Sequence, residues 1–150
     1  MDSARTSWFK RSGKPLTNDE VFENLTRVIF QGGLSWDIIQ RKWPSFQQAF
    51  ANFSIDDVVN FTEDDIANLI ENKDIIRNSV KIEATLHNAK ELQKITEGFG
   101  SFFKYLDSIG REKNYAVIIK DLTKRMKRLG KKSSYIFLYS IGENIEWDIE

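Results

Sequence analysis

Gln31-Gly32-Gly33-Leu34-Ser35-Trp36 is the stretch that decides how the rest of the chain is interpreted. It joins the apolar end of one predicted helix, at Val28-Ile29-Phe30, to the start of another. The two glycines allow the backbone to approach another surface closely and to adopt φ angles closed to other residues. Leu34 and Trp36 are side chains that insert into, or stack on, a flat object. The alternative is a tight corner between two packed helices.

Working outward, the spacing of apolar residues is helical almost throughout the chain. Thr17-x-x-Glu20 forms a capping box that predicts a helix running to about Phe30. Ser35 predicts the start of the next helix, which we expect to end before Pro44 because the residue before a proline avoids helical ψ. Further helix starts are predicted at Ser54, Thr62, Asn78 or Ser79, Ser101, Asn114 and about Ser133. The helix beginning near Asn114 is expected to bury Val117 and to end at Gly130. The predicted fold class is therefore all-α, with about eight to ten short helices.

The composition narrows the class of protein. A chain of 150 residues is long enough for one ordinary core, so residues 1–150 are expected to form a single helical domain. The absence of cysteine and the single histidine, His87, argue against a thiolate or multi-histidine zinc site. No apolar run reaches the length of a membrane span, and the first residues lack the apolar core of a secretory signal. We therefore expect a cytoplasmic protein.

The net charge of +0 conceals an uneven distribution of charge. Residues 111–132 contain nine basic and two acidic residues, a net charge of about +7. An acidic patch at residues 56–65 offsets part of it. The basic stretch is either a surface that faces phosphate groups or an ordinary solvated helix surface, and charge alone does not separate the two.

Several blocks, in order and spacing, make the chain similar to a known family. They are Phe22-Glu23 with Gln31-Gly32-Gly33-Leu34-Ser35-Trp36, the stretch 43–53, Ile75-Ile76-Arg77-Asn78, Lys81-Ile82, Asn88-Ala89, Phe99-Gly100-Ser101-Phe102 and Phe137 with Ile141-Gly142. Together they resemble the bacterial DNA-3-methyladenine glycosylase I family, from about Gly13 to Gly142. The resemblance implies a helix-hairpin-helix DNA glycosylase-like bundle with an N-terminal arm at 1–16 and a hairpin at about 70–82.

The resemblance also implies an activity and a set of site residues. Such an enzyme flips an alkylated purine such as 3-methyladenine out of double-stranded DNA and cuts its N-glycosidic bond, a step of base-excision repair. Leu34 would fill the gap left in the base stack, with Gly32 and Gly33 allowing close approach. The flipped base is a flat cation, and aromatic faces bind flat cations. The base pocket is accordingly expected to use Trp36, Trp8, Gln31 and Tyr139, between Val28 and the last helix.

The predicted hairpin supplies the contacts to the DNA backbone. Ile76, Arg77, Asn78 and Ser79 would offer backbone N–H groups and a helix N-terminus to a phosphate, and Arg77 and Lys81 would add positive charge. The alternative for this segment is an ordinary turn between two helices.

Two departures from the family pattern bear on catalysis and metal binding. The family's pocket glutamate falls on Val28, and Glu23 is displaced from it by about 140° around the same helix. The catalytic residue is therefore unknown, although Glu143 or Glu146 could reach the pocket from the chain's end. The Cys/His zinc site of the family has no counterpart here, so we expect no metal and no other cofactor.

The sequence thus leads to three hypotheses. The first is a monofunctional N-glycosylase, acting as a monomer without an associated lyase activity. The second is a catalytically impaired or altered-specificity relative that binds DNA. The third is a helical protein-interaction domain that retains only the scaffold.

Overall fold

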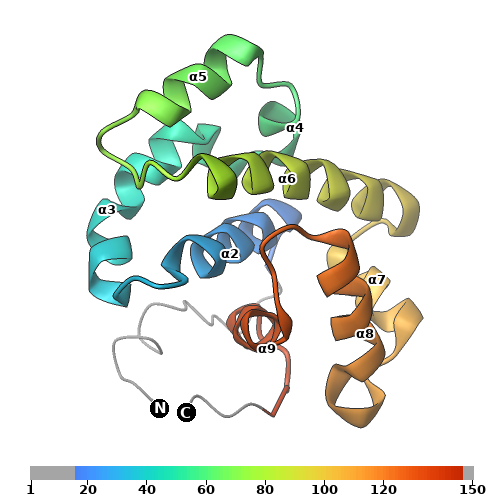
Figure 1. Ribbon diagram of the computed structural model, residues 1–150. Coiled ribbons are helices and arrows are strands. Elements are labelled where there is room, and N and C mark those ends of the chain that lie inside the picture. The colour runs from blue at the N-terminus through green and yellow to red at the C-terminus, as the bar shows by residue number, and fades with distance from the viewer. Residues whose placement is uncertain (1–15, 147–150) are drawn as a thin grey trace.

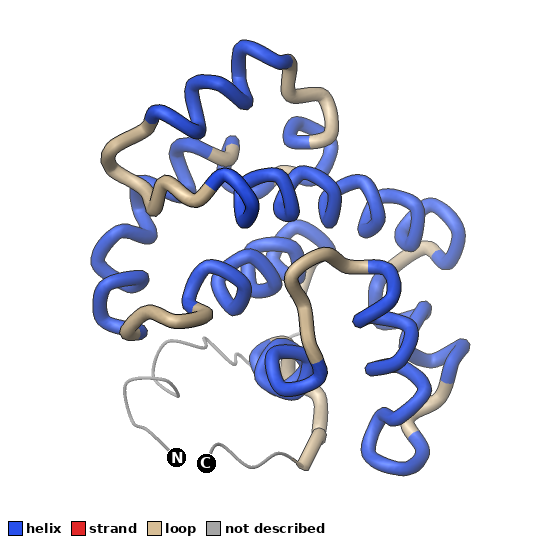
Figure 2. Tube along the Cα trace, in the orientation of Figure 1, coloured by secondary structure: helices blue, strands red, loops and turns tan. Residues whose placement is uncertain are grey.

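The computed structural model describes residues 16–146, and every regular element within that range is helical (Figure 1, Figure 2). The elements are α2 (Asn18–Gln31), α3 (Trp36–Ala49), η1 (Ala51–Phe53), α4 (Ile55–Val58), α5 (Glu63–Glu71), α6 (Ser79–Phe99), α7 (Phe102–Ile109), α8 (Glu112–Arg125) and α9 (Lys131–Ser140). The predicted all-α class is confirmed. Trp8 and most of the predicted arm at 1–16 lie outside the described residues. Between residues 16 and 146, no helix is both long and apolar enough to span a membrane.

Side-chain caps explain where most helices begin. The Thr17 hydroxyl accepts a hydrogen bond from the Glu20 N–H, and the Glu20 carboxylate accepts one from the Thr17 N–H, which confirms the predicted capping box. The other predicted caps that the structure confirms are Ser35, Ser54, Thr62, Asn78 and Ser101. Each of these side chains accepts a bond from the N–H three residues later, where the helix itself supplies no acceptor.

The predicted break before Pro44 is wrong, because α3 continues through this residue. Proline lacks the N–H that would bond to the carbonyl of Gln40. Gln40 is exposed, so water can satisfy that carbonyl. Trp43 and Phe46, on either side of the proline, are 3% and 0% exposed. Burial of these two aromatic side chains favours one continuous helix over the local preference of the pre-proline residue.

The predicted cap at Asn114 is also wrong, because α8 begins at Glu112 with a left-handed turn in which Asn114 has φ 52°. The Asn114 amide instead pairs with the backbone of Glu146, donating to its carbonyl (2.7 Å) and accepting from its N–H (2.9 Å). Val117, expected inside, is 59% exposed. The helix ends at Arg125, and Gly130 precedes α9 instead of closing α8. Local sequence could not indicate that the last residues of the domain occupy the Asn114 side chain.

The core is organised around α2. Helix α6 crosses one side of α2, and α9 packs on the other side (Figure 1). Helix α3 follows α2 in the chain and contacts it, and both α4 and α5 contact α6. An aromatic stack joins α3 to the turn that follows it, with Trp43 4.8 Å from Phe46 and 5.2 Å from Phe53 between ring centroids. Phe22 of α2 meets the edge of Phe53 at 5.6 Å. This packing fixes the angle at which α3 leaves the corner at residues 31–36.

Glu23 reinforces that angle with a polar contact. Its carboxylate accepts hydrogen bonds from Trp43 Nε1 (2.8 Å) and Gln47 Nε2 (2.9 Å) and pairs with Arg27 (3.4 Å). The Arg27 guanidinium lies 5.0 Å from the Trp43 ring centroid. The ion pair lies within α2, while the two hydrogen bonds to Glu23 and the ring contact of Arg27 cross from α2 to α3. Because these groups are largely shielded from water, the contacts link the two helices more strongly than surface charges would.

We therefore expect Glu23→Ala to lower the free energy of unfolding by about 1–3 kcal/mol, because it leaves the Trp43 N–H and the Arg27 charge without this acceptor in a largely buried place. Urea unfolding measures the loss. The matched control is Glu97→Ala, which removes an exposed carboxylate near the C-terminal end of α6, where a negative charge is not stabilised by the helix. Equal stability of the two variants would contradict the role given to Glu23.

Candidate nucleic-acid interface

The stretch that opened the sequence forms a type II β-turn between α2 and α3. Gly32 has φ −50° and ψ 115°, Gly33 has φ 84°, and the Leu34 N–H donates to the Gln31 carbonyl at 2.7 Å. The third position of this turn requires positive φ, which explains a glycine at Gly33. The Gln31 side-chain amide donates to the Leu34 carbonyl, also at 2.7 Å. The turn is thus closed twice and presents a defined shape.

The predicted wedge and pocket residues take different positions around this turn. Gly32 and Gly33 are exposed, and Leu34 is half-buried with part of its side chain against the core. Trp36, expected as a pocket wall, is 6% exposed and belongs to the core. Tyr139 on α9 is half-buried. The wedge and pocket functions of these residues stay predictions.

Lys81 lies beneath the turn and corrects one expectation. Its ammonium donates to the carbonyls of Gly32 (2.8 Å) and Phe30 (3.2 Å), and the residue is 7% exposed. Burial, and secondly the charge of Arg128, lower the pKa of this ammonium. Lys81 was expected to add charge at a DNA phosphate, but the structure directs that charge to the last carbonyls of α2. It acts there as a cap, because those carbonyls have no partner within the helix.

The segment predicted to be the hairpin is a short loop, residues 72–78, between α5 and α6. Ile75, 3% exposed, anchors the loop in the core, and Asn78 caps α6 through its bond from the Lys81 N–H (3.1 Å). Arg77 and Ser79 are exposed, and Ile76 is half-buried. The first N–H groups of a 21-residue helix therefore face solvent beside an arginine, an arrangement that suits a phosphate. Lys81 joins this hairpin to the Gln31–Trp36 turn, so the two predicted DNA contacts form one surface.

A cleft of about 520 Å³ opens beside that surface, between the end of α2 and the start of α9. It is lined by Val28, Ile29, Gly32, Lys81, Thr123, Met126, Arg128, Leu129, Gly130 and Ser133. We call it the Val28 cleft. The expected aromatic lining is not found among these residues, which are aliphatic, small or cationic, and Trp36 is not one of them. No carboxylate among the described residues lines it either.

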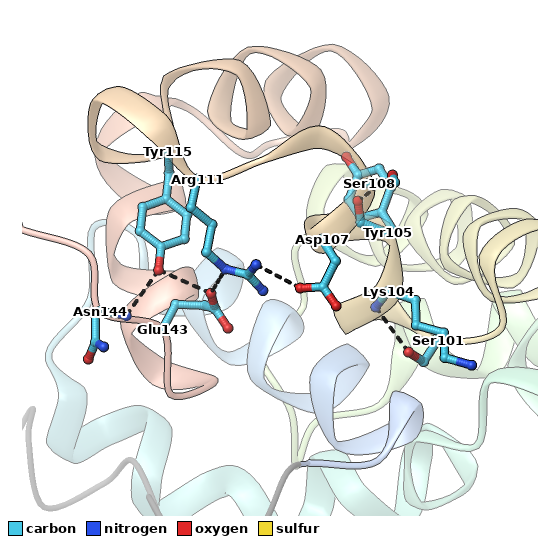
Figure 3. Close-up of polar contacts among 9 residues, drawn as sticks. All are labelled: Ser101, Lys104, Tyr105, Asp107, Ser108, Arg111, Tyr115, Glu143 and Asn144. Atoms are coloured by element: carbon cyan, nitrogen blue, oxygen red, sulfur yellow. Dashed lines mark hydrogen bonds and ion pairs between the residues drawn. The ribbon is translucent and has the colours of Figure 1, made fainter.

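The glutamates that could have replaced the missing carboxylate are placed elsewhere. Glu143 accepts hydrogen bonds from Arg111 Nε (2.6 Å) and from the Tyr115 hydroxyl (3.0 Å), and all three side chains point toward one another in Figure 3. The bond to Glu143 raises the pKa of Arg111. Glu146 is exposed and its backbone is held by Asn114. The speculation that either residue reaches the pocket receives no support from these positions.

Sequence reasoning missed the connecting residues of this surface. Glu23, Lys81 and Asn114 each bind backbone or side-chain groups that lie 20 or more residues away in the sequence. The one available signal was the Gly32–Gly33 pair, since an exposed helix end without its own cap needs a donor from another segment.

The amino-acid sequence is similar to a known protein family and to a known bacterial protein. The sequence profile of a family described as methyladenine glycosylase matches residues 6–142. The DNA-3-methyladenine glycosylase of Haemophilus influenzae is 27% identical over 152 residues, which cover 89% of this chain and 82% of that protein.

The fold is also similar to solved structures of 3-methyladenine DNA glycosylase I. The 3-methyladenine DNA glycosylase I of Staphylococcus aureus superposes with a TM-score of 0.77 at 27% identity, covering 94% of this chain and 86% of that one. A single-residue variant of 3-methyladenine DNA glycosylase I in complex with 3-methyladenine superposes with a TM-score of 0.78 at 26% identity, covering 98% and 91%.

The turn geometry predicts opposite results for one substitution at two glycines. Gly33→Ala is expected to destabilise the fold by about 1–2 kcal/mol, because a Cβ disfavours positive φ. Gly98→Ala, in the last turn of α6 with open space around its Cβ, is expected to be neutral or to stabilise the fold by up to about 1 kcal/mol. Urea unfolding of both variants measures the difference. A Gly33→Ala protein as stable as the native chain would argue against the type II turn.

The role of Lys81 predicts a local effect. Lys81→Met keeps the aliphatic stem but removes the donor to the Phe30 and Gly32 carbonyls, so the turn should open more often. Hydrogen exchange at the Leu34 amide should speed up by about tenfold or more. Lys94→Met, on the same helix with its side chain 71% exposed, is the control and should leave that amide unchanged.

Proposed function

Because the chain belongs to the methyladenine glycosylase family, whose profile matches residues 6–142, we propose that it is a DNA-repair glycosylase. The proposed reaction is hydrolysis of the N-glycosidic bond of an alkylated purine, such as 3-methyladenine, after the base has been flipped from double-stranded DNA. The observation that carries the proposal is the rigid Gln31–Trp36 turn, fastened by Lys81 to the hairpin at residues 72–78.

The turn supports base flipping. Extrusion of a base costs a few kcal/mol, and an apolar side chain that enters the stack offsets part of that cost. Leu34 follows two exposed glycines, so little but backbone stands between it and an approaching duplex. The hairpin supports the grip on the backbone through the N-terminus of α6 and Arg77.

Cleavage without a pocket glutamate needs another source of stabilisation. An N3-methylated adenine is cationic in DNA, and it becomes neutral when the electrons of the glycosidic bond return to the ring. A base bound in the Val28 cleft would lie near Lys81 and Arg128. These cations disfavour the charged, bound base more than the neutral leaving group, so they favour bond breaking at a cost in affinity. Water then adds to the sugar and releases a proton to solvent.

The state of Lys81 supports a monofunctional enzyme. A lyase activity needs an amine with a free lone pair to attack the sugar. Among the described residues, Lys81 is the lysine that lines the Val28 cleft. Its nitrogen donates to the carbonyls of Phe30 and Gly32, so attack on a sugar would require these bonds at the end of α2 to break. The expected product is an abasic site in an intact strand.

The runner-up is a DNA-binding relative that no longer cuts. It is favoured by Val28, which is 2% exposed and stands at the position where the resemblance noted in the sequence implies a pocket glutamate. The third hypothesis, a protein-interaction domain, predicts binding to DNA that is weak or insensitive to salt, whereas phosphate contacts predict binding that weakens steeply as salt rises.

The proposal predicts release of free 3-methyladenine from methylated duplex DNA by the native protein, measured by chromatography of the released base. Leu34→Ala should reduce the rate by about tenfold or more, because flipping loses its apolar wedge. Phe99→Ala, which truncates an exposed apolar side chain at the far end of α6, should keep the native rate.

A second variant separates an enzyme from a binder. Val28→Glu should increase base release if the Val28 cleft receives the base, because it supplies a carboxylate to the lining. If the native protein releases no base at high concentration while Val28→Glu does, the natural protein is a binder and the proposed activity is wrong.

A further inference from the structure

A second cleft, of about 370 Å³, lies between α8 and α9. Three exposed lysines line it, Lys113 and Lys120 from α8 and Lys131 from α9, above a floor that includes Tyr135. We call it the lysine groove. No acidic side chain is among the described residues that line it. The groove is therefore a concave surface with positive charge on both rims.

Helical spacing and a special turn produce this alignment. Ala116, Lys120 and Thr123 follow one face of α8 at intervals of four and three residues. Lys113 lies in the left-handed turn that starts α8, with φ 54°. A non-glycine residue rarely adopts this conformation without support, and here Asn114 is held by two hydrogen bonds to the Glu146 backbone.

The same turn is fixed from its other side by Tyr115, which has φ 65°. Its hydroxyl donates to Glu143 (3.0 Å) and accepts from the Asn144 N–H (3.1 Å), contacts visible in Figure 3. The position of Lys113 is thus set by the chain's last described residues and is not left to a mobile loop.

The acidic residues of α8 do not neutralise the groove. Asp121 pairs with Arg125 (3.0 Å) and accepts the Tyr105 hydroxyl. The Glu112 carboxylate lies next to Gly110. Helix α9 contains no acidic residue. In a protein whose formal net charge is +0, a face with three lysines and, among residues 16–146, no carboxylate in its lining is a local concentration of positive charge.

The lysine groove continues into the proposed DNA-binding surface. Thr123 lines both this groove and the Val28 cleft. The lining of the Val28 cleft in turn includes Gly32 of the Gln31–Trp36 turn, Lys81 beneath that turn, and Arg128. A line of cations therefore runs from the turn, past the place proposed for the flipped base, to Lys113 at the start of α8.

We propose that the lysine groove binds the phosphate backbone of the duplex outside the flipped nucleotide, as a second DNA contact separate from the hairpin and the wedge. The inference rests on the proposed function only in that both require duplex DNA. Each strand of duplex DNA carries one charge per about 3.4 Å of helix axis, so a backbone that follows the groove would place phosphates along its lysines. The solvated-surface alternative for the basic stretch predicts no such contact.

The test compares two double variants of equal charge in the full-length protein. Lys120→Ala/Lys131→Ala removes the lysines of both rims, and Lys90→Ala/Lys104→Ala removes two exposed lysines from α6 and α7. The probe is a fluorescent duplex with one stable abasic-site analogue, in a short form and in a form extended by about one helical turn of 10 base pairs. Binding is measured by anisotropy over a series of salt concentrations.

We expect the native protein and the control to bind the longer duplex more tightly than the short one. The groove variant should lose that gain, with an affinity for the longer duplex about tenfold lower and a slope of log K against log salt smaller by about 1.8. Thermal unfolding checks that both variants fold. If the control variant loses the same affinity for the longer duplex, the effect comes from net charge alone and the proposal is overturned. An unchanged slope of log K against log salt in the groove variant would also overturn it.

Base release measured in parallel keeps the two proposals apart. A native protein that releases no base, yet shows a salt slope dependent on Lys120 and Lys131, contradicts the glycosylase activity and supports the groove. If the native protein releases base, and both double variants keep the full gain in affinity for the longer duplex, then only the groove proposal is contradicted.

Discussion

The bonds from the Lys81 ammonium to the carbonyls of Phe30 and Gly32 are the interaction on which the candidate site depends. A buried ammonium is costly unless its hydrogens are accepted, and the end of α2 supplies carbonyls that have no helical partner. One contact thus satisfies two groups that would each be unfavourable alone. It also joins the start of α6 to the Gln31–Trp36 turn, so the proposed contact with the DNA backbone and the proposed insertion of Leu34 into the base stack would share one support.

The second constraint is the apolar surface at Val28. With Ile29, Met126 and Leu129 it forms the apolar part of the cleft lining, while Lys81 and Arg128 supply positive charge. Such a lining suits a leaving group that is positively charged before cleavage and neutral after it, because the chemistry then needs little proton transfer. It suits an unactivated base less well, since departure of a neutral purine requires a proton donor and no acidic side chain among the described residues lines the cleft.

Sequence patterns predicted the elements well where the deciding interactions were local. The caps at Thr17, Ser35 and Asn78 act within three residues, so a short motif carries the whole signal. The failures at Pro44 and Asn114 have the opposite cause. The aromatic burial around Pro44 and the backbone of Glu146 beside Asn114 come from other parts of the fold, and no local rule contains them.

The sequence by itself determined the helical class and the resemblance to the family, and it marked the glycine pair at residues 32 and 33 as a special backbone position, because periodicity, capping and the φ freedom of glycine are properties of adjacent residues. Only the tertiary structure showed that the Lys81 ammonium donates to carbonyls at the end of α2, that Trp36 belongs to the core and that the lysines of α8 and α9 line one groove. The physical reason is that charge and burial act through space. A lysine's partner, or a tryptophan's exposure, is set by whichever distant segment packs against it.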